Sequence, residues 1–514
     1  MKSDEEGTDF DVAVIGGGIN GTGVAREAAY RGYRTLLLEK DDFGQATSGQ
    51  STKMIHGGIR YLETGDFHLV YESLRERATL LRTAPNLVKP IRLVIPIYQN
   101  SPRSGWMVRL GTMLYDLLAG WRNMKRSRRL SRSELEALPG LRKEGLRWAV
   151  AYSDGQVQDS RLCLETALSA RVAGASIRNY HEVTGAKEGP HGFELSGIDH
   201  RSGQPFCYSA RAVVNASGPW CPFLEQRTLQ HQTKPMVYDR GIHIVVPSLG
   251  LDCGLALMLN DGRLLFVLPW QENYTLIGTT ESSFQGNDFT QVPISEEEVD
   301  YLLGHTNHFF PDRGLTRADV VHYYSGVRTL VAGQELAMTK LSREADIRMF
   351  SNHPGTAWMI LYGGKLTSYR ALAEKTLNKL ADQIPPPLGK NCQKTSLTSL
   401  YGGDSIPPFS SLPNTVSTDQ ATAWQRRYGS RWEALESLVR KKPTLAEPLV
   451  PRFQFTRADL VYMVTKELAF RLEDITQRRT KMAYALTDTE RKRLMAALES
   501  EVGQLPQFEP TNCA

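Results

Sequence analysis

The sequence predicts an α/β fold: a Rossmann-type dinucleotide-binding domain, an inserted substrate domain with a mixed sheet, and an α-helical domain at the C-terminus. Three observations lead to this prediction. A strand, a glycine-rich turn, a helix and a second strand open the chain, the middle of the chain is rich in strands, and helical patterns follow the prolines at 385–387. The 514 residues exceed what one hydrophobic core usually holds, so two or three domains are expected.

The N-terminal unit has the pattern of a β-α-β motif. Residues 10–15 are predicted to form a short buried strand, residues 22–31 a helix with small residues facing inward, and residues 35–39 a second strand. The unit is about 30 residues long, which is the size that this motif requires. The turn between strand and helix has the form Gly-x-Gly-x-x-Gly, so the motif predicts a dinucleotide at the start of the helix.

The residue types of this turn each have a physical role in holding a pyrophosphate. Gly16 permits the tight turn, Gly18 lets the backbone approach the ligand, and Gly21 allows close packing of the helix. Asn20 lies in the same turn and is expected to contact the cofactor. Glu39 ends the second strand, where its carboxylate would accept hydrogen bonds from ribose hydroxyls and would repel the 2′-phosphate of NADP.

A second polar segment covers residues 47–62. Small hydroxyl residues are followed by a lysine, a histidine and a glycine pair, which predicts another loop that approaches a ligand closely. A site in two parts suits a long cofactor with a flavin end far from its adenine end, so FAD is favoured over NAD. The alternative is an ordinary polar loop. The cofactor contacts expected here are Thr47, Ser48, Ser51, Lys53, His56 and Gly57.

The remaining elements define the predicted domains. Strands are expected at residues 177–186, 193–198, 211–216, 242–246, 264–268 and 274–278, and helices at 456–472 and 488–502. We therefore expect a discontinuous FAD-binding domain at 1–80, 150–235 and 340–385, a substrate domain at 81–149 and 236–339, and a helical domain at 390–514.

Residues 46–63 resemble the FAD-dependent, aerobic-type glycerol-3-phosphate dehydrogenases. The resemblance continues in order through later motifs: VNASGPW at 214–220, HIVVP at 243–247, FVLPW at 266–270, IGTT at 277–280, YSGVR at 324–328, GGKLTSYR at 363–370 and RRTK at 478–481. An ordered set of this kind is far more specific than one motif, and it covers almost the whole chain.

This resemblance implies a substrate domain like that of D-amino-acid oxidases beside the FAD domain, and a helical C-terminal domain. It implies that the C2 hydride of sn-glycerol 3-phosphate passes to flavin N5, that dihydroxyacetone phosphate forms, and that the electrons go to a quinone. The FAD is expected to be bound tightly without a covalent bond. The cofactor contacts implied in the later motifs are Val183, Ser217, Gly218, Lys365, Leu366 and Thr367.

The catalytic candidates are cations and histidines. A phosphate ester needs fixed positive charge, and the planar fork of arginine suits it; the resemblance places Arg60 and Arg328 in the substrate pocket. Oxidation of an alcohol also needs a base, for which His56 and His243 are the candidates. We favour His56 as the base and His243 as a hydrogen-bond donor to the substrate. Lys365 would stabilise the anionic reduced flavin.

Three positions depart from the family pattern. Gly49 stands where a serine is common, and Glu281 stands where an aspartate is usual. After Arg328 the family often continues with proline and acidic residues, whereas this chain has TLVAGQ at 329–334. These departures put fine substrate specificity in question.

The segment 103–132 is basic and amphipathic. It contains eight lysine and arginine residues and one acid, Asp116, and its apolar residues recur on one helical face: Met107, Leu110, Leu114, Leu117 and Trp121. This pattern fits a helix in the interface of an anionic membrane. The alternative is a helix packed on the core with a solvated basic tail. A quinone dissolved in lipid favours the membrane.

Composition and the distribution of apolar, cysteine and histidine residues bear on whether the protein is membrane-spanning, secreted or metal-binding. Hydrophobic content of 41% with 23% charged residues is typical of a globular protein, and no apolar run reaches the roughly 20 residues of a membrane span. The N-terminus lacks a secretory signal, and the six cysteines are scattered without zinc spacing, so a cytoplasmic protein is expected, peripheral on the cytoplasmic face of the inner membrane. His305 and His308 are interpreted as structural, and no metal is expected.

Three alternative functions remain at this point. The first is a glycerol-3-phosphate oxidase that passes electrons to oxygen, and the second is an FAD-dependent RNA-modifying protein whose basic segment holds phosphates. The third is a flavin-binding protein without catalysis. Scattered cysteines and paired arginines on the substrate side argue against the second, so no nucleic-acid partner is expected. The oligomeric state stays open, with a homodimer among the options.

Overall fold

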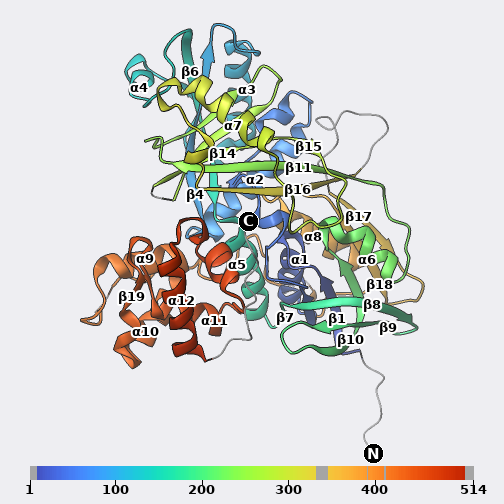
Figure 1. Cartoon of the computed structure of the whole chain (residues 1–514). Coiled ribbons are helices and arrows are strands. Elements are labelled where there is room, and N and C mark those ends of the chain that lie inside the picture. Colours follow the sequence, from blue (N-terminus) through green and yellow to red (C-terminus); the bar gives the residue numbers. More distant parts are fainter. Residues whose placement is uncertain (1–7, 272, 332–344, 390–391, 410–411, 504–514) are drawn as a thin grey trace, which may run out of the picture.

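The computed structural model describes residues 8–271, 273–331, 345–389, 392–409 and 412–503, which form two large sheets and a helical C-terminal domain (Figure 1). The first sheet has the order β17-β18-β10-β1-β2-β7, with β8 and β9 added beyond β10. Pairing is parallel from β18 to β7. Its strands are β1 (Phe10–Ile15), β2 (Thr35–Leu38), β7 (Ser176–Arg178), β8 (His181–Gly189), β9 (Gly192–Asp199), β10 (Gln204–Asn215), β17 (Asp346–Phe350) and β18 (Ala357–Tyr362).

The centre of this sheet is buried on both faces, which explains the unbroken apolar sequence of its strands. Helices α1 (Ile19–Tyr30), α5 (Asp159–Val172) and α8 (Tyr369–Leu380) cover one face. The β8–β9 hairpin and α6 (Cys221–Arg227) cover the other. Since α1 starts directly after β1, its N-terminus lies at the carboxyl edge of the parallel strands, where α/β sheets bind ligands.

The second sheet is mixed and has ten strands, in the main order β15-β11-β14-β13-β12-β4-β6-β3, with β16 paired to β11 and β5 to β6. Helices α2 (Phe67–Thr83) and α3 (Gly105–Ala119) pack on one face, and α7 (Glu296–Phe309) packs on the other. The strands are β3 (Met54–Ile55), β4 (Val88–Tyr98), β5 (Arg128–Arg129), β6 (Leu146–Val157), β11 (Met236–Pro247), β12 (Gly254–Met258), β13 (Leu264–Trp270), β14 (Tyr274–Gly278), β15 (Ser282–Ser283) and β16 (His322–Val331).

The C-terminal domain is mainly helical and packs beside α5 (Figure 1). Its core joins α9 (Thr418–Tyr428), α10 (Trp432–Lys441), α11 (Arg457–Thr465) and α12 (Asp488–Val502), next to the small β19–β20 sheet (Pro448–Val450 and Phe455–Thr456). A π-helical stretch, Asp474–Arg479, follows α11. Buried ion pairs tie the domain to the first sheet region: Arg161 with Glu467, and Asp42 with both Arg478 and Arg479.

Several element boundaries differ from the sequence prediction. Strands 10–15 and 274–278 and helix 488–502 are confirmed as predicted. Helix α1 starts at Ile19 instead of residue 22, because the end of the glycine turn already has helical geometry. The strand expected at 177–186 is divided in two, since Tyr180 has a left-handed φ of 62°. The helix expected at 456–472 ends at Thr465, ahead of Leu468 with φ of 58°.

Two strands do not follow the expected domain limits. Strand β6 runs across the limit set between residues 149 and 150 and stays in the second sheet up to Val157. The short strand β3 also belongs to the second sheet, although it lies within residues 1–80. Residues 332–344, where part of the variant segment after Arg328 falls, lie outside the described residues.

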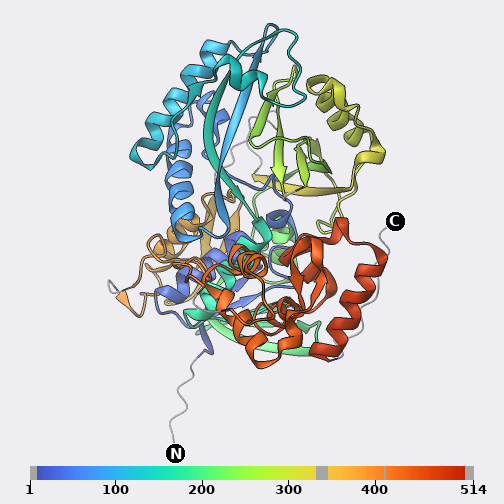
Figure 2. The ribbon, with the colours of Figure 1, turned by 90° about the vertical axis from the view of Figure 1, so that its left-hand side faces the viewer.

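Helix α3 turns its apolar face away from the protein. Trp106 (77% exposed), Leu110 (67%) and Leu117 (75%) face solvent, while Thr112, Tyr115 and Ala119 pack inward. The helix lies on the outer side of the second sheet, in light blue in Figure 2. The interpretation as a core-packed amphipathic helix is therefore wrong for this face. Basic residues follow at the exposed Lys125, Arg126, Arg128 and Arg129.

Candidate active site

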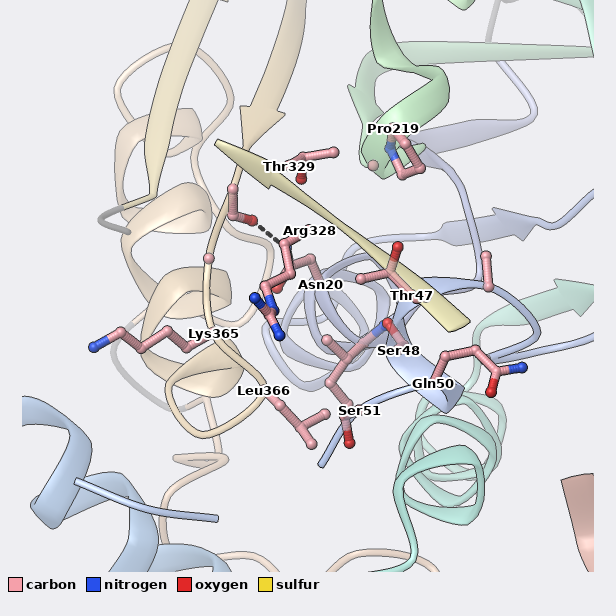
Figure 3. A pocket seen from close by; sticks show the side chains of 18 of the residues that line it. Asn20, Thr47, Ser48, Gln50, Ser51, Pro219, Arg328, Thr329, Lys365 and Leu366 are labelled. Carbon is pink, nitrogen blue, oxygen red and sulfur yellow. Dashed lines mark hydrogen bonds between the residues drawn. The ribbon is translucent and has the colours of Figure 1, made fainter. Parts of the chain in front are cut away.

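One pocket of about 1080 Å³ lies where the two sheets meet. Its wall is contributed by segments distant in sequence: the glycine turn, residues 44–52, strands β8, β11 and β16, and the loop 363–367. Figure 3 labels Asn20, Thr47, Arg328 and Lys365 among the lining residues, and these four come from four of these segments. A cavity of this size is at the upper end for ligand sites, as a dinucleotide together with a small substrate requires.

The glycine turn has the geometry of a phosphate-binding turn. Gly16 has φ of 111°, and a Cβ there would lie 2.6 Å from the carbonyl oxygen of Ala216. A Cβ on Gly21 would lie 1.9 Å from the carbonyl oxygen of Gly16, so this glycine permits close packing of α1. Gly18 is the N-cap of α1 and gives no side-chain cap to the first turn. Apart from the N–H of Ile19, which donates to Ser48, the start of α1 is therefore available to an anionic ligand.

The wall around the turn holds polar groups that suit the rest of a dinucleotide. Ser48 Oγ accepts a hydrogen bond from the backbone N–H of Ile19 at 2.9 Å, which joins residues 47–49 to α1. Asn20 Nδ2 donates to the carbonyl of Gly363 at 2.9 Å, and the buried Oδ1 of Asn20 has no hydrogen-bond partner among the described residues. This leaves an acceptor beside the turn for a ligand hydroxyl.

Glu39, the predicted ribose acceptor, lines the pocket, and its carboxylate also supports the turn. Its carboxylate accepts the N–H of Gly17 at 2.5 Å and the N–H of Asp41 at 2.8 Å. Burial, with the neighbouring Asp41 carboxylate, raises the pKa of Glu39 to about 7. His181, Val183 and His200 line the same pocket as Glu39. The residues present fit the adenosine half of FAD.

His56 stands at the meeting point of two loops. Its backbone N–H donates to Thr367 Oγ1 at 3.1 Å, and its carbonyl lies 3.2 Å from the same hydroxyl. The next N–H, that of Gly57, donates to the hydroxyl of Tyr115 at 2.7 Å, and this hydroxyl in turn donates to Asp154. The position of the His56 loop is thus fixed from the 363–367 loop on one side and from α3 on the other.

His243 is buried in the pocket wall on β11. Its Nε2 lies 3.0 Å from Thr52 Oγ1, its ring stacks on Tyr324 with a centroid distance of 4.9 Å, and its Nδ1 has no hydrogen-bond partner among the described residues. Burial, helped by the charges of Lys53 and Arg328, holds the pKa of His243 well below its usual range. The imidazole is therefore neutral at physiological pH.

Arg328 lies on β16 directly across from Asp239 of β11. Its Nη1 donates to Asp239 Oδ2 at 2.6 Å, its Nη2 donates to Thr279 Oγ1 at 3.3 Å, and Glu281 lies 3.8 Å away. A Cβ on Gly241 would lie 2.7 Å from Arg328 Nη2, so the glycine gives the guanidinium its room. The arginine is held in one orientation, with a carboxylate on one edge of its fork.

Arg60 and Lys365 line the same pocket. Arg60 lies in the short 3-10 helix Ile59–Leu62. Lys365 follows Gly363 and Gly364, whose left-handed φ values of 64° and 95° turn the chain out of β18, and its Nζ lies over the ring of Tyr61 at 3.7 Å. Two cations from different segments therefore share the wall with the two histidines.

The structure brings most of the predicted site residues into this single pocket, but not all of them. Gly21 packs against the turn, and Gly57 lies behind the wall under Leu74 and Tyr115. Lys53 is buried in an ion pair with Asp159. The predicted residues that line the pocket are Gly16, Gly18, Asn20, Glu39, Thr47, Ser48, Ser51, His56, Arg60, Val183, Ser217, Gly218, His243, Arg328, Lys365, Leu366 and Thr367.

Sequence reasoning missed the partners of the charged site residues. Asp239 and Asp159 lie in no motif, Lys481 closes the RRTK motif without any sign of its partner, and all three meet their partners only through long-range packing. The alternation of β11 could have indicated that Asp239 and His243 lie on one face, since they are four residues apart on a strand. Groups of three or more potential metal ligands are absent from the described residues, and none of their helices is long and apolar enough to span a membrane.

Comparisons with known proteins agree with this architecture. A family model described as FAD dependent oxidoreductase matches residues 11–370, and a model of the C-terminal domain of alpha-glycerophosphate oxidase matches residues 355–501. A glycerol-3-phosphate dehydrogenase of Synechocystis sp. is 37% identical over 94% of this chain and 90% of its own length. A D-erythritol 1-phosphate dehydrogenase of Brucella abortus is 34% identical over 94% of this chain and 96% of its own.

A solved structure shares the fold. The glycerol-3-phosphate dehydrogenase from Bacillus halodurans, complexed with FAD, superimposes with a TM-score of 0.74 at 24% identity, over 98% of this chain and 92% of that one. The two sheets and the C-terminal domain thus occur together in a protein crystallised with the cofactor that the pocket fits.

Proposed function

The chain belongs to the FAD-dependent oxidoreductase family, among the glycerol-3-phosphate dehydrogenases, and from this premise we propose how its residues oxidise sn-glycerol 3-phosphate to dihydroxyacetone phosphate. FAD is its cofactor and, when bound, accepts a hydride at N5. One observation carries the proposal: a single pocket is lined both by the dinucleotide turn and by His56, His243, Arg60, Arg328 and Lys365. A phosphorylated alcohol fits this combination, since its phosphate needs cations and its hydroxyl needs a base.

The three cations have different roles: two bind the phosphate, and the third stabilises developing negative charge. Arg60 and Arg328 bind the phosphate, and the fixed orientation of Arg328 lets its remaining N–H groups serve as directional donors. Lys365 lies in the loop that follows β18 and supplies positive charge where negative charge develops during hydride loss. Because Arg328 is held by Asp239 and Thr279 before the substrate arrives, little ordering of this side chain remains on binding.

A histidine removes the hydroxyl proton. We assign His56 as the base, because its loop is fixed on both sides by Thr367 and Tyr115 and its side chain lines the pocket. His243, neutral and bonded to Thr52 through Nε2, orients the substrate hydroxyl. The reverse assignment stays as the alternative, because His243 Nδ1 has no hydrogen-bond partner among the described residues.

The decisive experiment follows the flavin absorbance after anaerobic mixing with single compounds. Glycerol 3-phosphate is expected to bleach the flavin, whereas glycerol and lactate at equal concentration leave it oxidised, because they lack the group that the arginines bind. Lactate serves as the control for a 2-hydroxy acid with one negative charge. Equal bleaching by glycerol would show that the phosphate is not needed for recognition. Bleaching by none of the compounds would contradict the proposed function.

A longer polyol phosphate is a second candidate substrate. Glu281 lines the pocket beside Arg328, and a carboxylate accepts hydrogen bonds from hydroxyl groups. A tetritol phosphate would bring one more hydroxyl than glycerol 3-phosphate to this end of the pocket. The Brucella abortus relative is named for such a substrate. Erythritol 1-phosphate therefore belongs in the same bleaching series, and the larger kcat/KM identifies the better substrate.

The electrons pass on to a quinone at a membrane surface in this proposal. Helix α3 exposes an apolar face with basic residues beside it, which is the arrangement of a helix that lies in a membrane interface. Helix α2 packs against α3 and exposes Phe67 and Tyr71 as well. A soluble quinone analogue is expected to reoxidise the reduced flavin faster than air does, and a stoichiometric yield of peroxide in air would instead favour the oxidase.

A further inference from the structure

A buried cluster of three charges lies behind the pocket wall formed by residues 47–52. Lys53 Nζ contacts Asp159 Oδ2 at 2.6 Å, and the side chains of both are almost fully buried. Asp159 also accepts hydrogen bonds from Ser51, through N–H at 3.2 Å and through Oγ at 2.8 Å. One carboxylate at the start of α5 thus holds Ser51 of this wall segment and also Lys53, the residue that follows the segment.

The third charge comes from the C-terminal domain. Lys481 Nζ donates to Ser160 Oγ at 2.8 Å and to the carbonyl of Gly49 at 3.3 Å, and it lies 3.6 Å from Asp159 Oδ1. The same carbonyl of Gly49 accepts from Lys53 at 2.8 Å. Two lysines 428 positions apart in the sequence therefore hold one peptide group and one carboxylate.

The wall segment leads from this cluster directly to His243. Thr52 Oγ1 lies 3.0 Å from His243 Nε2. The hydroxyl of Tyr324 donates to the carbonyl of Ser51 at 2.8 Å, while its ring stacks on His243 with an interplanar angle of 14° and carries Lys53 Nζ at 4.5 Å from the centroid. A displacement of residues 49–53 would therefore move both neighbours of the imidazole.

The charges in the cluster do not balance, because two lysines face one carboxylate. Around Lys481 lie Lys53, Asp159, Arg478 and His322. Burial and the charge of Lys53 lower the pKa of Lys481 to about 7, although Asp159 opposes the shift. Burial, with the two lysine charges, lowers the pKa of His322 to about 4, so this histidine is neutral when Lys481 titrates.

We propose that Lys481 is a positioning residue through which the C-terminal domain completes the active site, by fixing residues 49–53 and, through Thr52 and Tyr324, the ring of His243. In addition to its packing contacts, the C-terminal domain then fixes the position of residues in the catalytic centre. The inference rests on the proposed function only for its activity readout. The alternative is a purely structural role, in which Lys481 only helps to dock the domain, as the Arg161–Glu467 ion pair does.

Three variants separate these readings. Lys481→Met removes the charge and keeps the length, Lys481→Arg keeps a permanent charge, and Glu467→Gln weakens another buried interdomain ion pair on the same helix, α5, without touching Gly49 or Asp159. For each variant we measure kcat and KM between pH 6 and 9, the dissociation constant of FAD from the apoprotein, and the thermal midpoint of the apoprotein across the same pH range.

Lys481→Met is expected to lower kcat by about 10- to 100-fold with little change in KM, because misplacement of a catalytic group by about 1 Å has effects of this size. It is also expected to weaken FAD binding. Lys481→Arg restores most of kcat and shows no titration near pH 7. Glu467→Gln lowers the thermal midpoint and leaves kcat at the wild-type value.

The stability of the apoprotein gives a test that is independent of turnover. In the folded wild type Lys481 releases its proton near pH 7, whereas in the unfolded chain it keeps the proton up to the ordinary range of an ammonium group. Stability relative to Lys481→Met must therefore increase as the pH rises above about 7. If Lys481→Met does not fold, Ser160→Ala removes the 2.8 Å acceptor without a change in charge, and its kcat is expected to fall in the same direction.

The proposal is overturned if a folded Lys481→Met or Ser160→Ala variant has wild-type kcat and FAD affinity, or if Glu467→Gln reproduces the whole loss of kcat. Failure of the proposed function would look different. No polyol phosphate would then bleach the wild-type flavin, while the FAD titration and the pH series of the apoprotein would still decide the role of Lys481.

Discussion

Arg328 illustrates how a single side chain is tuned by its neighbours. It faces Asp239 across an antiparallel strand pair, where side chains lie close enough for direct contact. The carboxylate orients the guanidinium and partly balances its charge, and Glu281 adds a second negative charge at 3.8 Å. Affinity for a phosphate dianion must therefore come from Arg60 and Lys365 as well, and not from Arg328 alone.

Replacement of Arg328 by alanine is expected to raise KM for glycerol 3-phosphate by roughly 10- to 100-fold, since a hydrogen bond to a charged group is worth about 1.5–3 kcal/mol. Steady-state kinetics with a quinone analogue measure this change. Arg240→Ala is the matched control: Arg240 lies on β11 next to Asp239, pairs with Glu298 and does not line the pocket. Equal KM values for Arg328→Ala and the wild type would contradict the phosphate assignment.

The two histidines are distinguishable by pH dependence. A base must be unprotonated to act, so kcat/KM falls on the acid side of its titration. His243 is already neutral there, because burial keeps its pKa well below the usual range. We therefore expect His243→Asn to retain the acid limb of the kcat/KM profile at reduced kcat, and His56→Asn to lose the limb together with most activity. A limb that vanishes only in His243→Asn would exchange the two roles.

At the scale of elements, α3 has an inverted arrangement for a helix on a globular protein. Its small and polar residues face the sheet, and its large apolar residues face outward. Exposed tryptophans at both ends, Trp106 at 77% and Trp121 at 83%, suit the boundary between water and lipid. Exposure of such an apolar face to water is unfavourable, and covering the face lowers the free energy of the system.

Membrane binding is therefore expected to depend on both components of this element. Co-sedimentation with vesicles that contain anionic lipid should fall strongly when Leu110 and Leu117 are both changed to serine, and when Arg126, Arg128 and Arg129 are reversed in charge. Leu397→Ser provides the control, because Leu397 is exposed to a similar degree, 71%, in a different part of the chain. Unchanged binding in the charge-reversed variant would exclude the electrostatic part.

The sequence allowed α3 to be predicted as amphipathic but not its orientation. The periodicity of Met107, Leu110 and Leu117 is the same whether the apolar face meets a core or a membrane. The opposite side decides the orientation: Thr112, Tyr115 and Ala119 already fill the contact with the sheet, and Tyr115 is bonded to Gly57. This information lies in long-range contacts, and no local pattern carries it.

At the scale of the whole molecule, buried ion pairs join the C-terminal domain to the nucleotide-binding region. Asp42 is fully buried between Arg478 and Arg479. Although burial opposes it, the two guanidinium groups hold the pKa of Asp42 below its usual range. The stability that this carboxylate contributes is present above the ordinary carboxyl pKa and is lost only as the pH falls through the lowered value. The interface should therefore tolerate mild acid.

Asp42→Asn is expected to reduce the free energy of unfolding by about 3–5 kcal/mol, because it leaves the buried Arg479 without its counter-charge and Arg478 with Asp474 alone. Urea denaturation at pH 7, followed by tryptophan fluorescence, measures this change. Asp9→Asn is the control, since Asp9 makes exposed hydrogen bonds to Ser209. A loss no larger than that of the control would mean that the three charges contribute little net stability.

Much of the architecture could be predicted because local signals agree with it. The glycine turn between β1 and α1 has one physical reading, and Phe10–Ile15 is short, apolar and followed at once by glycine. The partners of charged residues could not be predicted in this way. Lys53 looked like a cofactor contact because it lies in a polar loop, yet its charge is directed to Asp159, which no motif marks.

The strand order of the first sheet has a consequence for how the protein is made. Neighbours β1, β10 and β18 are separated by nearly two hundred and then nearly one hundred and fifty positions in the chain. A ribosome releases residues in order, at about 5–20 per second. The nucleotide-binding layer therefore waits until Ala357–Tyr362 has been synthesised before its central strands can all pair, and cofactor loading has to follow that step.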